Sequence, residues 1–180
     1  MPVLATLTLL GALALSGCAT GPSTATSGTA TPGTAATAAA TESASPEACS
    51  GVRVVVDFGT LAAPKITDCV ATATTIAASA VMKTAAISTE GTVQYGDQIV
   101  CRVNGRPAAD ETVTVTGQAS FVESCQSMAP AYAYWALWIQ TAPGAAWEYA
   151  QEGLGSLQVT PGQSLGLVFT TGAETPTPGS

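Results

Sequence analysis

Alternation of apolar and polar residues predicts the first and last strands of a folded region. In the segment 52–58, valine or phenylalanine recurs at every second position, so these side chains share one face of a strand that Gly59 ends. In the segment 164–170, Leu165, Leu167 and Phe169 alternate in the same way. Each segment is therefore expected to lie with one face against a core.

The segment from Asp68 to about Met82 is predicted as a helix. Its apolar residues recur near helical spacing, and Asp68 stands where a side chain caps a helix start. The threonines of its first half are poor helix formers, so packing must hold the helix in place. The apolar positions are Val70, Ala73, Ala77, Ala80 and Val81, and the threonines are Thr72, Thr74 and Thr75.

Shorter strands and tight turns are expected in the middle of the chain. Residues 92–95 form a short strand, and Gly96-Asp97 turns the chain into a strand over residues 99–103. Asn104-Gly105 suits a two-residue hairpin turn, because both residues accept positive φ. Residues 113–116 alternate again and are predicted as a further strand.

The richest aromatic segment is 132–140. As a strand it directs Tyr132, Tyr134 and Trp138 to one face, and Trp135, Leu137 and Ile139 to the other. Pro143-Gly144 then turns the chain towards the segment 146–150, which contains Trp147 and Tyr149. The complete order of elements predicts an α+β domain in which one helix covers a mostly antiparallel sheet.

The amino-terminal segment has the form of a lipoprotein signal peptide. An apolar run from Val3 to Leu15 is shorter than the roughly 20 residues of a membrane-spanning helix. The run ends in Leu15-Ser16-Gly17-Cys18, which resembles a bacterial lipobox. We expect cleavage after residue 17, a lipid on Cys18, and an extracytoplasmic protein held to the cell membrane by that lipid.

Composition divides the remaining chain into a tether, a domain and a tail. Residues 18–47 are mainly Ala, Thr, Ser, Gly and Pro, a composition that predicts a disordered tether. Residues 48–171 have the size of one ordinary domain. Residues 172–180 repeat the Thr and Pro of the tether, and they are predicted to be a disordered tail.

Four cysteines remain once Cys18 is assigned to the lipid. An even number in an oxidising compartment predicts two disulfides, for which three connectivities exist. Sequence neighbours pair most readily and each flanks a predicted strand, which favours Cys49 with Cys69 and Cys101 with Cys125. A metal site is disfavoured, because the chain has no histidine and no CxxC spacing. No cofactor is expected.

The charge of the chain argues against nucleic acid as a partner. The formal net charge is −7, and the five basic residues are scattered along the sequence, which leaves no cluster for phosphate groups. They are Arg53, Lys65, Lys83, Arg102 and Arg106.

The same composition limits catalysis to carboxylates. Without histidine there is no Ser-His or Cys-His nucleophile, and the predicted disulfides occupy the other thiols. Glu148 is the best candidate, because Trp147 and Tyr149 flank it, although alternation in a strand predicts that it faces solvent. The Gly153 to Gly155 segment lacks the basic residue and helix of a phosphate loop. The remaining candidate carboxylates are Asp57, Asp97, Asp110, Glu111 and Glu152.

Short motifs along the domain resemble a known family. They are Val54 to Gly59, Tyr95-Gly96-Asp97, Val100 to Gly105, Tyr134 to Trp138, Trp147-Glu148-Tyr149 with Gly153, Pro161-Gly162, and Gly166 to Phe169. Their order resembles uncharacterised exported lipoproteins of actinobacteria, which are in turn similar to the small carboxyl-terminal domain of transcobalamin and intrinsic factor. The resemblance implies a β-grasp-like domain and the binding of a corrinoid or another planar ligand.

Three functions follow as hypotheses. The first is a non-enzymatic, lipid-anchored domain that binds a flat or sugar-like ligand, a glycan or an envelope protein through an exposed aromatic surface. The second is a structural or accessory envelope lipoprotein whose aromatic residues are all core. The third is a carboxylate-dependent, glycosidase-like enzyme. The residues proposed for ligand binding are Tyr132, Tyr134, Trp138, Trp147 and Tyr149.

Overall fold

The computed structural model describes residues 49–177. The predicted signal peptide (1–17), the predicted lipid acceptor Cys18 and the predicted tether (18–47) lie outside the described residues. In the part that is described, no helix combines the length and the apolar character that crossing a membrane requires.

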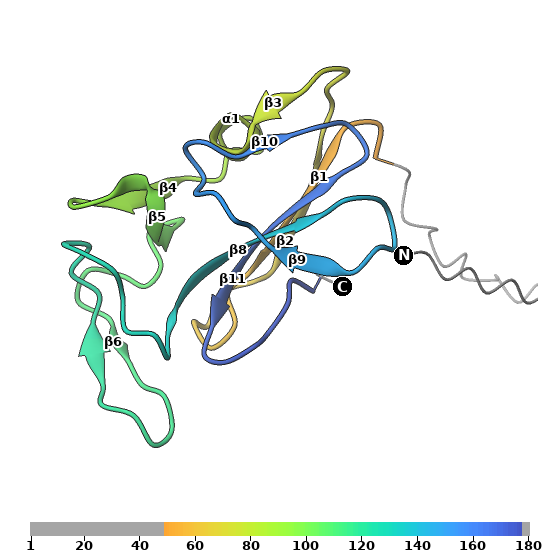
Figure 1. Ribbon diagram of the computed structural model, residues 1–180. Helices are drawn as coiled ribbons and strands as arrows, with labels where there is room; N and C mark the ends of the chain where they lie inside the picture. Colours follow the sequence, from red (N-terminus) through yellow and green to blue (C-terminus); the bar gives the residue numbers. More distant parts are fainter. Residues whose placement is uncertain (1–48, 178–180) are drawn as a thin grey trace, which may run out of the picture. The chain divides into compact units, whose positions relative to one another are not determined.

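A five-stranded mixed sheet forms the centre of the domain (Figure 1). Its strands lie in the order β2-β1-β11-β8-β9, so the first and last strands of the sheet in sequence, β1 and β11, are neighbours. These two run parallel, whereas the other three pairs are antiparallel. The bounds are β1 Val52–Asp57, β2 Ile66–Val70, β8 Tyr134–Gln140, β9 Trp147–Tyr149 and β11 Ser164–Thr170.

Short elements surround this sheet. Three two-stranded sheets pair β3 with β10, β4 with β5, and β6 with β7, and the described residues contain a single helix, α1 (Figure 1). The domain is therefore α+β, as the sequence predicts. The bounds are β3 Ile76–Ala77, α1 Ala78–Thr84, β4 Thr89–Thr92, β5 Gly96–Val103, β6 Thr112–Val113, β7 Phe121–Val122 and β10 Gln158–Val159.

The core lies on one face of the central sheet, beneath α1. Alternate residues of β1, β8 and β11 point into it, as the period-two pattern of the sequence predicts. The ring of Trp135 meets Phe58 and Phe169 edge to face, with centroids 5.4 and 5.6 Å apart. Its indole N–H donates to the carbonyl oxygen of Arg106 at 3.0 Å, so this buried polar group is satisfied.

The helix is shorter than predicted. The prediction of a helix from Asp68 is wrong, because residues 66–70 form β2 and pair antiparallel with β1. Asp68 does not cap a helix, since α1 begins ten residues later and has no side-chain cap. Between β2 and β3 the Thr72 hydroxyl donates to the carbonyl of Thr74, so threonine side chains here stabilise a bend rather than a helical turn.

The central strands and the hairpin turn follow the sequence pattern with shifted ends. The strand predicted over 92–95 lies three residues earlier, as β4, and that predicted over 99–103 begins earlier, as β5. Asn104 and Gly105 have φ of 49° and 70°, and Val103 and Arg106 exchange backbone hydrogen bonds of 3.0 and 2.9 Å across them. The predicted tight turn is confirmed.

Both predicted disulfide pairs are present. Cys49 bonds to Cys69 in β2, and Cys101 in β5 bonds to Cys125 in the loop before β8. The sulfurs of Cys101 and Cys125 lie within 4.8 Å of a Glu90 carboxylate oxygen. Because the disulfide consumes both thiols, this group offers no thiolate for a metal ion.

The carboxyl-terminal segment 172–177 packs on the domain rather than extending from it, which corrects the prediction of a disordered tail for these residues. It crosses the face of the sheet opposite the core. A Cβ on Gly166 would lie 2.3 Å from Pro176 Cγ and 3.1 Å from the Trp147 ring. Pro176 is buried there, because the missing side chain of Gly166 leaves it room. The sequence shows only the Thr and Pro content of the segment and not this recess.

Polar contacts fasten the segment at both of its ends. The Thr177 hydroxyl donates to Asp57 Oδ2 and accepts from the ammonium of Lys65, which also pairs with Asp57 at 3.1 Å. Glu174 accepts hydrogen bonds from the hydroxyl of Thr170 and from both the amide and the hydroxyl of Thr171. Residues 172–177 therefore belong to the folded domain.

Candidate functional site

Four of the five aromatic residues proposed for binding share one face of the β8–β9 hairpin: Tyr134, Trp138, Trp147 and Tyr149. Trp138 lies opposite Tyr149, and Gln140 lies opposite Trp147, so all these side chains point away from the core. The rings of Trp138 and Tyr149 meet edge to face at 5.6 Å. Trp138 Nε1 is buried without a hydrogen-bond partner among the described residues, which leaves an unused donor beside Tyr149.

Tyr134 belongs to this aromatic face, whereas Tyr132 does not. Tyr134 begins β8 on the same face as Trp138, four positions earlier. Tyr132 precedes the strand, its hydroxyl donates to the carbonyl of Ala119 at 2.7 Å, and its ring packs edge to face on Phe121. Tyr132 therefore holds the β6–β7 hairpin and is not part of the aromatic surface.

The aromatic face is only partly exposed. Tyr149 is 48% exposed, whereas Tyr134, Trp138 and Trp147 are half-buried. The hypothesis of an exposed aromatic surface is therefore only partly correct, because Pro176 covers Gly166 on this face, beside the ring of Trp147.

A pocket of about 460 Å³ lies beside the exposed end of this face. Its walls come from residues 98–100 of β5, the loop around Met128 and Ala131, the first half of β8, and the segment 149–154. Trp135 and Leu137 line its core side, and Tyr134 and Tyr149, from the opposite face of the strands, are also among its lining residues. This size and largely apolar lining are typical of pockets that bind small molecules.

Few polar groups line the pocket, and some of them are already engaged. Gln98 Oε1 accepts from the Ser156 hydroxyl at 3.2 Å, and Gln151 Nε2 donates to the carbonyl oxygen of Tyr149 at 3.0 Å. Burial raises the pKa of the Tyr149 phenol above its usual value, and the neighbouring Tyr134 phenol raises this pKa further. Tyr149 is therefore neutral at physiological pH.

Glu148, Glu111 and Asp57 lie in different parts of the domain, and two of them are engaged by other residues. Glu148 is exposed and lies opposite Ile139, on the face of β9 away from Trp147 and Tyr149, so no aromatic wall surrounds it. Glu111 pairs with Arg106, and Asp57 binds the carboxyl-terminal segment. Glu152 is the one candidate that lines the pocket among the described residues.

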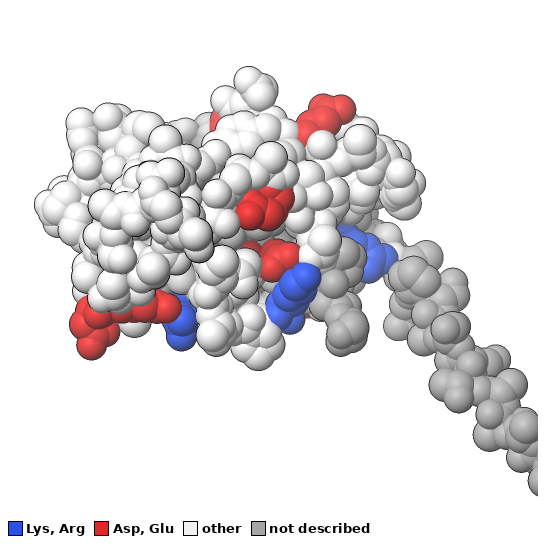
Figure 2. All heavy atoms as spheres, turned by 90° about the horizontal axis from the view of Figure 1, so that it is seen from below, with Lys and Arg blue, Asp and Glu red and all other residues white. Residues whose placement is uncertain are grey.

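Charged groups are sparse on the surface. Figure 2 shows few charged side chains and wide areas of uncharged surface on the face drawn there, with basic groups next to acidic ones. Arg102 and Arg106 are each paired with a glutamate, and Lys65 is paired with an aspartate. Among the described residues these ion pairs hold the fold together and do not form a basic patch for a polyanion.

Several pocket residues were not predicted from the sequence. Gln98, Met128 and Leu154 stand in segments far apart in the chain, and only the fold brings them together. Gly153 could have been noticed from the sequence alone, because a glycine often marks a close approach of two backbones. A Cβ at Gly153 would lie 2.4 Å from the carbonyl oxygen of Gln98, so this glycine allows the 149–154 segment to close against β5.

Comparison with family models, with curated proteins and with solved structures gives no match for this chain.

Proposed function

We propose that the described domain is a non-enzymatic binding domain that holds a small ligand in the pocket between β5, β8 and the segment 149–154. The observation that carries this proposal is the pocket itself, with a volume of about 460 Å³ and walls that are mainly apolar and aromatic. Glu152 as the one lining carboxylate, together with the absence of histidine from the sequence, supports binding over hydrolysis. A concave site of this size favours a small molecule over a protein partner.

The β-grasp assignment is part of the same proposal. A hairpin of β1 and β2, a helix, and a second hairpin of β8 and β9 surround a central β11 that is parallel to β1. This arrangement supports a β-grasp-like fold, and with it the resemblance to the transcobalamin domain.

The location outside the cytoplasm is inferred from two independent features. The lipobox that ends at Cys18 predicts export and lipidation, and two disulfides fit an oxidising compartment.

Replacing Cys18 by Ser removes the lipid acceptor. The variant is expected in the culture medium, whereas the natural chain sediments with membranes, as immunoblots of the two fractions can determine. Equal membrane association of both forms would contradict the lipid anchor.

A neutral fluorescent probe tests whether the pocket binds. We expect N-phenylnaphthylamine to gain fluorescence with the domain, and Ala131→Phe to weaken its binding at least about tenfold, because Ala131 lines the pocket and is exposed, so that a ring there fills the entrance. Ala109→Phe is the matched control, since Ala109 is also exposed but does not line the pocket. Equal binding by both variants, or no binding by the natural domain, would overturn the proposal.

A further inference from the structure

The lining of the pocket carries negative charge and no positive charge. Glu152 is its single ionised side chain, and no lysine or arginine belongs to its wall. The chain as a whole has a net charge of −7, with 5 basic and 12 acidic residues. Three of the basic side chains are held in ion pairs elsewhere in the domain. An anion entering the pocket would meet repulsion and no partner, whereas a cation would meet Glu152.

Two tyrosines line the pocket together with this carboxylate. They are Tyr134 and Tyr149, whose side chains lie on the face of β8 and β9 that points away from the core, and Trp138 packs against the Tyr149 ring edge to face at 5.6 Å. The face of an aromatic ring attracts a cation through its quadrupole, and this attraction is strongest where water is excluded. Tyr149 stays uncharged because its pKa is raised, so a ligand meets a phenol rather than a phenolate.

The small number of acceptors distinguishes between kinds of cation. A primary ammonium group has three N–H donors, each of which needs an acceptor when buried. In the pocket, Gln98 Oε1 already accepts from Ser156, and most of the lining is apolar. A quaternary ammonium group has no N–H donor and presents methyl groups to an apolar wall.

We propose that the pocket binds a small organic cation of the quaternary-ammonium class, with its methyl groups against Tyr134 and Tyr149 and its charge balanced by Glu152. This inference rests on the proposed binding function and gives its ligand class.

Choline and its uncharged analogue, in which carbon replaces the ammonium nitrogen, form the central comparison. The two have nearly the same shape, so they differ in charge alone. We expect choline to bind at least about tenfold more tightly in calorimetric titration, which corresponds to the strength of cation–π and carboxylate contacts at a partly buried site. Both ligands should displace N-phenylnaphthylamine from the pocket.

Two variants of neighbouring glutamates test the role of Glu152. Glu152→Gln should weaken choline binding several-fold and leave the affinity for the uncharged analogue unchanged, because only the cation interacts with the charge. Glu148→Gln is the matched control. Glu148 is exposed and does not line the pocket, so this variant should bind both ligands like the natural domain.

A spectroscopic readout locates the cation. A bound cation beside Tyr149 stabilises its phenolate, so choline should lower the pKa of this phenol in an ultraviolet titration, and the uncharged analogue should not. The Tyr149→Phe variant identifies the signal, because it lacks that phenol.

The outcomes separate the two proposals. If N-phenylnaphthylamine binds and responds to Ala131→Phe, but choline and its analogue bind equally, the cation inference is wrong and the binding pocket stands. The same conclusion follows if Glu152→Gln leaves choline binding unchanged. If the neutral probe itself fails to bind, the proposed function is overturned, and this inference with it.

Discussion

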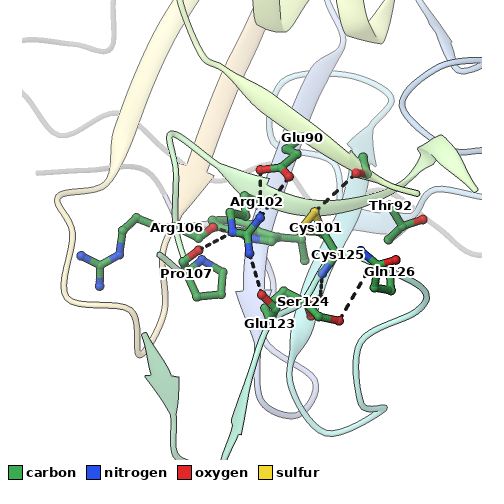
Figure 3. Close-up of a disulfide and its surroundings, with 12 residues drawn as sticks. Glu90, Thr92, Cys101, Arg102, Arg106, Pro107, Glu123, Ser124, Cys125 and Gln126 are labelled. Atoms are coloured by element: carbon green, nitrogen blue, oxygen red, sulfur yellow. Dashed lines mark hydrogen bonds and ion pairs between the residues drawn. A yellow bond between two sulfur atoms is a disulfide. The ribbon is translucent and has the colours of Figure 1, made fainter. Parts of the chain in front are cut away.

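The side chain of Arg102 joins several segments around the Cys101–Cys125 disulfide. Its guanidinium donates to both carboxylate oxygens of Glu90 at 3.0 Å, to the carbonyl of Pro107 at 2.9 Å and to the carbonyl of Glu123 at 2.6 Å (Figure 3). The side chain is only 11% exposed, whereas that of Glu90 is 55% exposed. The two hydrogen bonds to carbonyl oxygens are therefore less accessible to water than the ion pair with Glu90. They should supply most of the contribution of Arg102 to the stability of the fold.

Replacing Arg102 by Ala should lower the free energy of unfolding by about 2–4 kcal/mol, because two backbone carbonyls lose their donor and a partly buried cavity remains. Urea unfolding followed by fluorescence measures the change. Lys83→Ala is the control, since Lys83 is exposed on α1 and its loss should cost under about 0.5 kcal/mol. Equal effects of the two substitutions would contradict the role given to Arg102.

Gly166 is the residue that allows the carboxyl-terminal segment to lie on the sheet. Gly166→Ala places a methyl group where Pro176 packs, so we expect release of the segment and a cost of about 1–3 kcal/mol. The protease Glu-C cleaves after glutamate, and cleavage after Glu174 should accelerate in the variant, as mass spectrometry of the lost peptide shows.

Leu165→Val is the matched control for this experiment. Leu165 is fully buried and faces the core from the same strand, so the substitution destabilises the domain by about 1 kcal/mol without touching Pro176. Faster cleavage after Glu174 in Gly166→Ala alone identifies the recess as the cause. Equal acceleration in both variants would mean that general destabilisation releases the segment.

At the scale of the elements, acid should loosen the carboxyl-terminal segment. Burial raises the pKa of Asp57, but hydrogen bonds from Thr177 and Gly59 and the charge of Lys65 outweigh it and lower this pKa below its usual value. Hydrogen bonds, first of all from Thr170, also lower the pKa of Glu174. Carboxylates with lowered pKa values stabilise the folded state above about pH 4, and this contribution is lost as pH falls through the folded pKa.

We therefore expect the urea midpoint of the natural domain to fall between about pH 5 and pH 3. The double variant Asp57→Asn, Glu174→Gln removes both carboxylates and should show a smaller fall over the same range. A fall of the same size in the double variant would assign the acid sensitivity to other groups.

The sequence predicted the long strands better than the helix, and the reason is physical. In β1 and β11 the side chains that point into the core recur at every second position, although both faces of the two strands are buried, and this periodicity does not depend on the neighbouring strand. In the segment 68–82 the alanines carry little periodic information, and pairing with β1 determines the conformation of residues 66–70. Local propensity could not reveal that pairing.

The candidate site was predictable only in part for a related reason. Tyr134 and Tyr149 drew attention as aromatic residues of two neighbouring strands, and both line the pocket. Tyr132 has the same chemistry but packs on Phe121, because the chain bends before β8 begins. The opposite wall, with Gln98 and Met128, comes from distant segments whose proximity depends on the complete fold.

At the scale of the whole molecule, the two disulfides have different roles. Cys101 follows Val100 and Cys125 stands three residues before Met128, and both Val100 and Met128 line the pocket. This crosslink therefore fixes two walls of the pocket relative to one another. Cys49–Cys69 fastens the start of the domain to β2, which is at the opposite edge of the sheet from β9.

Removing either disulfide should cost stability, but only one removal should cost affinity. The bridges span 20 and 24 residues, so each contributes about 3 kcal/mol by restricting the unfolded chain. The Cys101→Ser, Cys125→Ser variant should also bind N-phenylnaphthylamine at least about fivefold more weakly, because its pocket walls must be ordered on binding. The Cys49→Ser, Cys69→Ser variant, equally destabilised, should retain the natural affinity at temperatures where it is folded. Equal loss of affinity in both variants would show that overall stability, and not the crosslink between the walls, preserves the pocket.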